Sequence, residues 1–226
     1  MTLQDQFGNI DIYVFDQLLR GRIASASAAA GRYGETSPKL AGDPRASEGG
    51  PGVRVFDAGC GGGRNLVYLL RNGFDICGND LDPNAVAQLR AMAAAIAPDA
   101  KPDLRVEPIE RTSFPDAHAD VVIASAVLHF ARDPDHFEAM LRQTWRVLRP
   151  GGVFFARLAS TIGIESDVTA LGDGRFRLPD GSDRFLVDAA VIESWTRTLG
   201  GTLLDPIKTT VVHNQRSMTT WVARRA

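Results

Sequence analysis

The chain has 226 residues, of which 44% are hydrophobic, and its formal net charge is −2. This length suffices for one large α/β domain with its own core, and the low charge offers no basic surface for nucleic acid. No apolar run approaches the roughly 20 residues that cross a bilayer, and the first residues lack the features of a signal peptide. We therefore expect a cytoplasmic protein without a nucleic-acid or membrane partner.

The two cysteines, Cys60 and Cys77, are too few for a disulfide framework. No second cysteine or histidine lies at ligand spacing from Cys60, so we expect no metal site. We interpret Cys60 as a small side chain that fills a niche between glycines.

The first segment, residues 7–22, predicts a helix because its apolar residues recur at spacings of three and four. The following stretch, residues 24–52, is rich in Ser, Ala, Gly and Pro and has few large apolar residues. This composition predicts a flexible loop.

From Val53 onward, apolar strand patterns alternate with helical ones, which predicts a mostly parallel sheet covered on both faces. Asp82-Pro83 and Asp133-Pro134 predict helix starts, since aspartate caps a helix and proline suits its first position. The expected strands are 53–57, 74–79, 104–109, 120–126 and 152–158.

The last third of the chain is less regular. A turn at residues 178–182 predicts a hairpin within 176–187, and residues 188–199 predict a helix that ends at two glycines. Two closing strands are expected at 203–212 and 218–223.

The most informative motif is residues 57–63, Asp-Ala-Gly-Cys-Gly-Gly-Gly, between an apolar strand and an amphipathic helix. Glycines at such a turn let a nucleotide approach the backbone at a helix N-terminus. A dinucleotide fingerprint requires glycine where Arg64 stands, and no P-loop lysine follows. Asp57 places a negative charge where a pyrophosphate would lie. The motif therefore favours a ligand with a cationic amine and no phosphate, such as S-adenosylmethionine.

Together with residues 78–82 and 148–152, this motif resembles the class I S-adenosylmethionine-dependent methyltransferases of the small-molecule type, over about residues 53–160. The resemblance implies a Rossmann-like, doubly wound α/β sheet of about seven mostly parallel strands with a closing antiparallel hairpin. We expect a single domain over residues 1–226. Its parts are a leading helix or lid (1–23), a flexible loop (24–52), a cofactor-binding core (53–160), and a substrate-side insert with the closing hairpin (161–226).

Ligands of doubly wound sheets lie beyond the carboxyl ends of the strands. Asp57 would meet the ammonium group of S-adenosylmethionine, with helix capping as the alternative. Gly59, Gly61 and Gly63 would bring backbone N–H groups to its methionine part. Asp80 would accept the ribose hydroxyls, as acids do in nicotinamide enzymes. Asp82 is the rival acid, but Pro83 after it favours a role as helix cap.

Adenine recognition departs from the family pattern. Many relatives place an aspartate where Pro108 stands, and proline offers no side-chain acceptor. Adenine is then held by Glu110, by backbone groups, or by apolar contact with Ile109 and Leu81. A solvated surface glutamate is the alternative for Glu110. Ser125, at the end of the fourth strand, is a further expected cofactor contact.

His129 follows the fourth strand, where methyl acceptors lie in the family. Its ordinary pKa near 6.5 would suit a general base. The alternative is a neutral histidine that hydrogen-bonds locally and orders the turn.

The acceptor side is expected to include Phe15, Arg22, Arg157 and Arg216. Arg157 lies in an apolar strand and needs an anionic partner, either a protein acid such as Glu165 or an acidic substrate. We prefer the internal ion pair.

These residues predict an enzyme that moves a methyl group from S-adenosylmethionine to a small molecule by in-line displacement. We expect a monomer or homodimer. The alternatives are a protein or RNA methyltransferase and a non-catalytic, S-adenosylmethionine-binding regulatory subunit. A nicotinamide reductase is disfavoured by Asp57 and Arg64.

Overall fold

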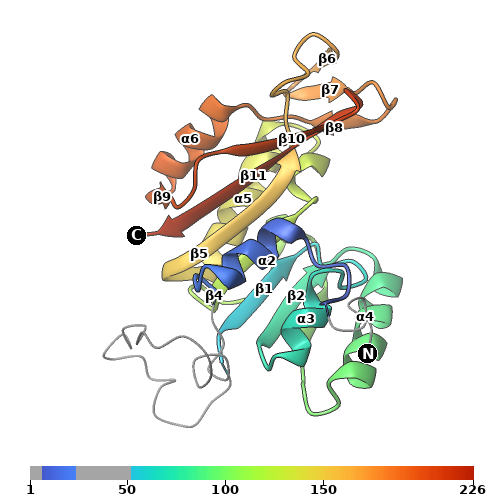
Figure 1. Cartoon of the computed structure of the whole chain (residues 1–226), viewed down its shortest axis with the longest axis vertical. Helices are drawn as coiled ribbons and strands as arrows, with labels where there is room; N and C mark the ends of the chain where they lie inside the picture. Colours follow the sequence, from blue (N-terminus) through green and yellow to red (C-terminus); the bar gives the residue numbers. More distant parts are fainter. Residues whose placement is uncertain (1–6, 24–51) are drawn as a thin grey trace.

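A computed structural model describes residues 7–23 and 52–226 of the chain (Figure 1). Its centre is an 8-stranded sheet in the order β10-β11-β5-β4-β1-β2-β3, with β9 paired to β11. The first five strands are mutually parallel, and the last three pair antiparallel at one edge. This arrangement confirms the predicted Rossmann-like fold. The strands are β1 (Arg54–Ala58), β2 (Asp75–Asp80), β3 (Asp103–Val106), β4 (Ala119–Ser125), β5 (Leu148–Ala159), β9 (Gly201–Leu203), β10 (Lys208–Val212) and β11 (Arg216–Arg225).

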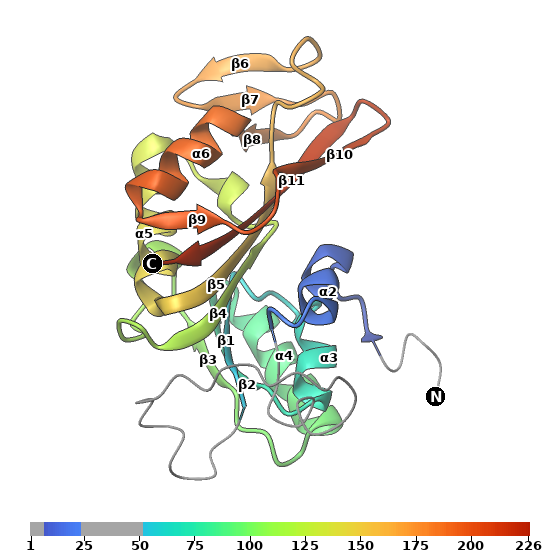
Figure 2. The same cartoon turned by 60° about the vertical axis from the view of Figure 1, so that its left-hand side comes forward.

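Helices cover both faces of the sheet (Figure 2). Successive side chains of β1 point to opposite faces, so that Val55 joins one apolar cluster and Phe56 the other. The Val55 cluster includes residues of α2 (Ile12–Leu19), α3 (Leu66–Arg71) and α4 (Pro83–Ile96). The Phe56 cluster includes residues of α5 (Pro134–Val147) and α6 (Ala189–Thr198).

Aspartates cap the longer helices as the sequence predicts. The Asp82 side chain accepts from the backbone N–H of Asn84, at 2.8 Å, and Asp133 accepts from His136, at 2.7 Å. Proline follows each of these two caps as the first helical residue. Each cap satisfies a backbone donor that has no partner inside its helix, so both predicted helix starts are confirmed.

Several element boundaries differ from the predictions. The leading helix covers only Ile12–Leu19, and the third strand ends at Val106. Ile109 instead belongs to the short 3-10 helix η2 (Ile109–Arg111), because Pro108 has no N–H to continue the sheet. The closing strand predicted over 203–212 is divided into β9 and β10. Except for residue 52, the predicted loop 24–52 lies outside the described residues.

An insert between β5 and α6 forms a separate 3-stranded sheet of β6 (Thr169–Gly172), β7 (Arg175–Arg177) and β8 (Asp183–Phe185). The predicted hairpin is confirmed in β7 and β8. Strand β6 was not predicted, because all its residues are exposed and no apolar alternation marks it. Phe185 of β8 stacks on Phe137 of α5 with ring centroids 4.7 Å apart, which fastens the insert to the main core.

The leading helix is fastened to the sheet through Asp11, whose side chain is only 1% exposed. Its carboxylate caps α2 by accepting from Tyr13 N–H at 2.9 Å, and it accepts from Arg157 of β5 at 3.0 Å. The Asp11 N–H donates to Asn65 at 3.0 Å. One aspartate therefore joins the helix, the sheet and Asn65, which lies two positions after the glycine turn of residues 57–63.

We expect Asp11→Ala to lower the free energy of unfolding by about 2–4 kcal/mol, since it removes a helix cap and leaves Arg157 without its partner. Asp16→Ala on the same helix is the control, because Asp16 makes a surface pair with Arg20. It should change stability little. Urea unfolding of both variants tests this, and equal losses would contradict the anchoring role of Asp11.

Candidate active site

The order of strands reverses next to β1, whose neighbours are β2 on one side and β4 on the other. In such sheets the connections leave on opposite faces and a crevice opens at the carboxyl ends of the strands. The glycine turn follows β1, Asp80 ends β2, and Ser125 ends β4. The fold thus brings the predicted cofactor residues to one edge of the sheet.

The three predicted glycines of the turn have φ angles of +69° at Gly59, +48° at Gly61 and +79° at Gly63. A Cβ on Gly59 would lie 2.4 Å from the Cγ2 atom of Val127, and one on Gly63 equally close to Leu89. These two glycines therefore permit close packing. A Cβ on Gly61 would meet no described atom within 4 Å, so its backbone is open to a ligand.

Asp80 is held against the glycine turn. One carboxylate oxygen accepts from Gly61 N–H and the other from Asp82 N–H, each at 2.9 Å. The side chain remains partly accessible, and each oxygen retains a further lone pair. The neighbouring Leu81 is 69% exposed, an unusual degree for leucine. The end of β2 therefore presents an oriented acid beside an apolar surface.

Asp57 is buried, with 2% of its surface exposed. Loss of hydration raises its pKa to about 7, with a further increase from Asp80 and an opposing effect of Arg64. Helix α3 begins after Asn65, so Asp57 does not cap it. A buried acid that titrates near neutrality favours a nearby cation, because the cation would stabilise its charged form.

Arg64 and Asn79 are site residues that the sequence analysis did not assign. Arg64 is 47% exposed, donates to Ser125 Oγ at 3.1 Å and lies 3.9 Å from the Asp11 carboxylate. Asn79 is fully buried, and neither atom of its side-chain amide has a hydrogen-bond partner in the described structure. Two features of the sequence could have indicated them: Arg64 is a cation directly after the glycines, and Asn79 is an amide within an apolar strand.

The residues expected near adenine lie in two different environments. Ile109 is buried, and its Cδ1 atom would be 3.5 Å from a Cβ on Gly59, which places it beside the glycine turn. Glu110 lies 3.3 Å from His136 of α5, and its side chain is only 19% exposed. Glu110 is therefore not a solvated surface residue. Of the expected adenine contacts, Ile109 therefore lies beside the glycine turn, whereas Glu110 already has a protein partner.

His129 lies in the 3-10 helix η3 (Leu128–Phe130) after β4, and it is 7% exposed. Its Nδ1 atom accepts from the Ala159 N–H of β5 at 3.1 Å, so the ring hydrogen is on Nε2. The pKa of His129 is lowered to about 4, chiefly by burial and in smaller part by the charges of Arg184 and Arg216. In this tautomer Nε2 is a donor, not a base. The geometry fits the alternative in which His129 orders the turn.

The four residues expected on the acceptor side do not converge. Arg157 does form the preferred internal ion pair, but its partner is Asp11 and not Glu165, which accepts from the N–H of Gly163. The other three make contacts elsewhere: Arg22 with Asp205, Arg216 with Asp180, and Phe15 with Phe7 and Tyr68. Spacing in the chain carries no information about these distant partners.

Other parts of the described structure offer no competing centre. Within residues 7–23 and 52–226, no three His, Cys, Asp or Glu side chains are grouped to hold a metal. One hollow there, of about 690 Å³, lies around the start of β2 and the end of α4, away from the glycine turn. In the same ranges no helix has the length and apolarity needed to cross a membrane.

A model of the methyltransferase domain family matches residues 56–156, which include the glycine turn, Asp80 and the end of β4. Residues 56–156 therefore form an S-adenosylmethionine-dependent methyltransferase domain. S-adenosylmethionine is the cofactor of this domain. The residues present fit it: a buried acid, an open glycine backbone, an oriented carboxylate and an unpartnered buried amide.

The methyltransferase is similar to several known proteins. It is 32% identical over 106 residues to an uncharacterized methyltransferase of Synechocystis, covering 46% of each chain. It is 26% identical over 181 residues to a ubiquinone biosynthesis O-methyltransferase of Chelativorans, covering 73% of this chain and 68% of that one. The match thus spans about half to two thirds of these relatives' length. Magnesium protoporphyrin IX methyltransferase of Synechocystis, solved with bound S-adenosylhomocysteine, shares the fold with a TM-score of 0.61 and 17% identity, covering 78% of this chain and 75% of that one.

Asp57 makes the stability of the ligand-free methyltransferase depend on pH. The folded state holds the Asp57 proton up to about pH 7, whereas the unfolded chain releases it near 3.8. Stability is therefore lost as the pH rises between these values. Asp57→Asn should abolish this loss. The free energy of unfolding of the variant, relative to that of the wild type, should therefore rise by roughly 1–3 kcal/mol from pH 5 to pH 8.

Urea unfolding at both pH values measures this effect. Asp99→Asn, at an exposed position, is the control and should follow the wild type. A parallel pH response of Asp57→Asn and the wild type would contradict the raised pKa.

Proposed function

We propose that this protein is an enzyme that transfers the methyl group of S-adenosylmethionine to a small-molecule acceptor. The observation that carries the proposal is the Asp80 carboxylate, held against Gly61 N–H at the point where the strand order reverses. An acid at this place can accept ribose hydroxyls while the open glycine backbone approaches the rest of the cofactor.

Each polar group at this edge has a proposed role. Asp57 faces the ammonium group, and Arg64 pairs with the carboxylate of the methionine part. Asp80 accepts from the ribose, while Leu81 and Ile109 contact adenine. Ser125 orients Arg64 through their hydrogen bond. Glu110 is a lesser candidate for adenine because His136 already engages it.

Bound S-adenosylmethionine supplies a methyl group on a positively charged sulfur, with a neutral thioether as leaving group. The chain's task is to align the acceptor with that bond and to exclude water, which can supply several kcal/mol of barrier reduction. His129 serves this alignment by holding η3 against β5 through Ala159. It does not remove a proton in this proposal.

A small-molecule acceptor is supported by the names of the similar proteins, which include a ubiquinone biosynthesis O-methyltransferase and a magnesium protoporphyrin IX methyltransferase. The net charge of −2 argues against an RNA acceptor. The intact glycine turn and Asp80 disfavour a purely regulatory role. A single domain, a cytoplasmic location and a monomeric or homodimeric state remain predictions.

Calorimetric titration of the purified protein with S-adenosylmethionine, S-adenosylhomocysteine and NADH tests the cofactor first. We expect micromolar binding of both sulfur compounds and no heat from NADH, because Asp57 would oppose a pyrophosphate. Radiolabelled S-adenosylmethionine then allows a screen of small acceptors for methylation. Binding of NADH alone would overturn the proposal.

The ribose contact predicts that Asp80→Ala weakens S-adenosylmethionine binding by at least about tenfold, since a charge-assisted hydrogen bond contributes about 1.5–3 kcal/mol. Asp82→Asn is the matched control, because asparagine preserves the cap of α4. It should leave the affinity within about threefold of the wild type. Unchanged affinity in Asp80→Ala would remove Asp80 from the cofactor site.

A further inference from the structure

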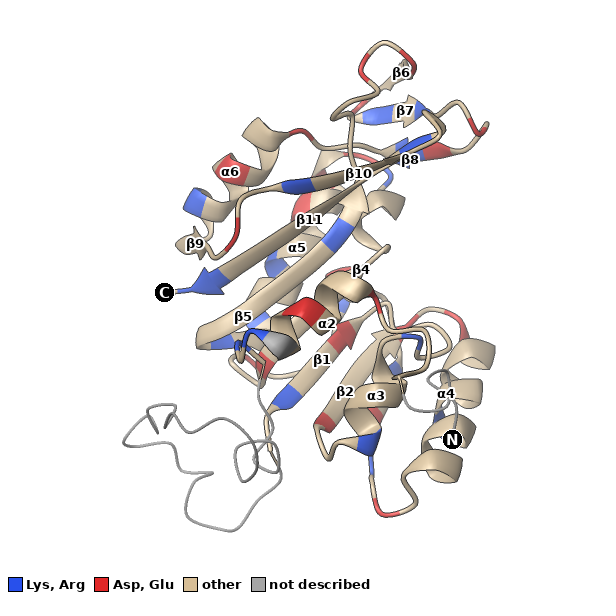
Figure 3. Ribbon diagram, viewed as in Figure 1, with Lys and Arg blue, Asp and Glu red and all other residues tan. Residues whose placement is uncertain are grey.

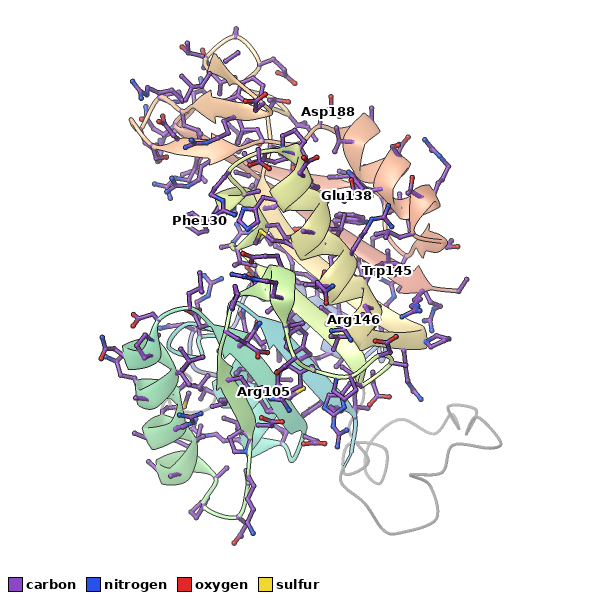
Figure 4. All side chains as sticks on the ribbon, turned by 180° about the vertical axis from the view of Figure 1, so that it is seen from behind. Arg105, Phe130, Glu138, Trp145, Arg146 and Asp188 are labelled. Atoms are coloured by element: carbon purple, nitrogen blue, oxygen red, sulfur yellow. The ribbon has the colours of Figure 1, made fainter. Side chains whose placement is uncertain are left out.

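The insert places the side chain of Arg184 beside η3, which follows the carboxyl end of β4. The guanidinium carbon of Arg184 in β8 lies 4.8 Å from the centre of the Phe130 ring in η3. Phe130 is 55% exposed, and Figure 4 shows it between the insert strands and the half of the molecule that contains α4. An exposed aromatic ring covered on one side by an arginine thus lies at the edge of the sheet that holds the cofactor residues.

Contacts connect this pair to the cofactor edge. Val127, which precedes η3, packs against Gly59 closely enough to exclude any side chain there. Ser125 accepts from Arg64. Phe130 is therefore only three positions along the chain from a residue that contacts the glycine turn.

Arg184 is the arginine of this region with donor capacity to spare. It donates to the carbonyl of its neighbour Asp183 at 2.7 Å and stacks on Phe130, and it forms no ion pair within the described residues. By contrast, Arg177 pairs with Asp183 at 2.8 Å, and Arg216 pairs with Asp180 at 3.1 Å. A guanidinium has five N–H donors in a planar fork, so most of those on Arg184 are available to a ligand.

The position of Arg184 is also well defined. Its neighbour Phe185 is buried against Phe137 of α5, and adjacent residues of a strand point to opposite sides. Directly across the hairpin, Phe176 pairs with Arg184, whereas Arg177 pairs with Asp183. Figure 3 shows the basic positions of β7 and β8 at the end of the molecule occupied by the insert. Of the two insert arginines whose contacts are described above, Arg177 pairs with Asp183, and Arg184 contacts Phe130 of η3.

Two arginines lie close to the buried His129 ring. Arg184 and Arg216 both act on the buried His129 ring to disfavour its protonation. Two acids lie nearby, and both already pair with other arginines: Asp180 with Arg216, and Asp183 with Arg177. An anion bound here would therefore meet a cation that lacks a carboxylate partner.

We propose that Arg184 and Phe130 bind the methyl acceptor, and that this acceptor is a small aromatic acid whose carboxylate pairs with Arg184 while its ring contacts Phe130. This inference rests on the proposed methyltransferase function. Arginine suits this task because its fork matches the two oxygens of a carboxylate and its flat face accepts an aromatic neighbour.

Benzoate and its uncharged analogue benzamide are suitable probes. The protein is first titrated with S-adenosylhomocysteine, and the loaded and unloaded forms are then titrated with each probe while arginine Nε–H signals are followed by NMR. We expect millimolar binding of benzoate to the loaded protein and binding of benzamide at least about tenfold weaker. The Arg184 signal should move with benzoate.

Arg184→Met should weaken benzoate binding by about tenfold, to the level of benzamide. Arg184→Lys should retain part of the affinity, since it keeps the charge but loses the fork. Arg177→Met is the matched control in the same hairpin and should bind benzoate like the wild type. Phe130→Ala should weaken both probes similarly.

Equal benzoate affinity in the wild type and Arg184→Met would overturn the acceptor assignment, as would no benzoate binding to loaded wild-type protein. A failure of S-adenosylhomocysteine to bind would instead refute the proposed function. The benzoate titration of the unloaded form then still tests Arg184 as an anion site.

Discussion

The reversal of strand order beside β1 is the constraint on which the rest of the molecule depends. Because β2 and β4 flank β1 on opposite sides, the chain must leave successive strands on opposite faces, and the carboxyl ends of β1, β2 and β4 are left uncovered between the helices. Polar groups can be held there by backbone N–H groups, as Gly61 holds Asp80. The glycines have two roles in this turn. Gly59 lets the Val127 side chain pack against the backbone, and Gly61 leaves space in which a ligand can approach the backbone.

Electrostatics at this edge are balanced by residues from distant parts of the chain. Asp57 is buried near Asp80, and the nearby Arg64 limits the cost of placing two acids together. Arg64 in turn lies between Ser125 and the Asp11 carboxylate, which also holds Arg157. The leading segment therefore contributes Asp11 to the charges around Arg64. A ligand carboxylate at Arg64 would compete with these internal partners.

The proposed acceptor side is built from a separate structural unit. The insert contributes β8, and Phe185 fixes it on α5, so that the arginine of the same strand reaches η3. His129 holds η3 from the other side through Ala159. In the proposed arrangement, cofactor and acceptor contact different segments, so a change in the insert would leave the glycine turn undisturbed.

Local rules in the sequence determined much of this protein. Aspartate caps, the proline after Asp82 and Asp133, the glycine turn and the alternation of strands with helices act over a few residues, and the predicted fold and cofactor edge follow from them. The tertiary structure alone decided the pairing of Arg157 with Asp11, of Glu110 with His136, and of Arg184 with Phe130. It also decided that His129 accepts a hydrogen bond from Ala159. These contacts join residues far apart in the chain, and their geometry depends on how strands, helices and insert pack together, which residue spacing does not encode.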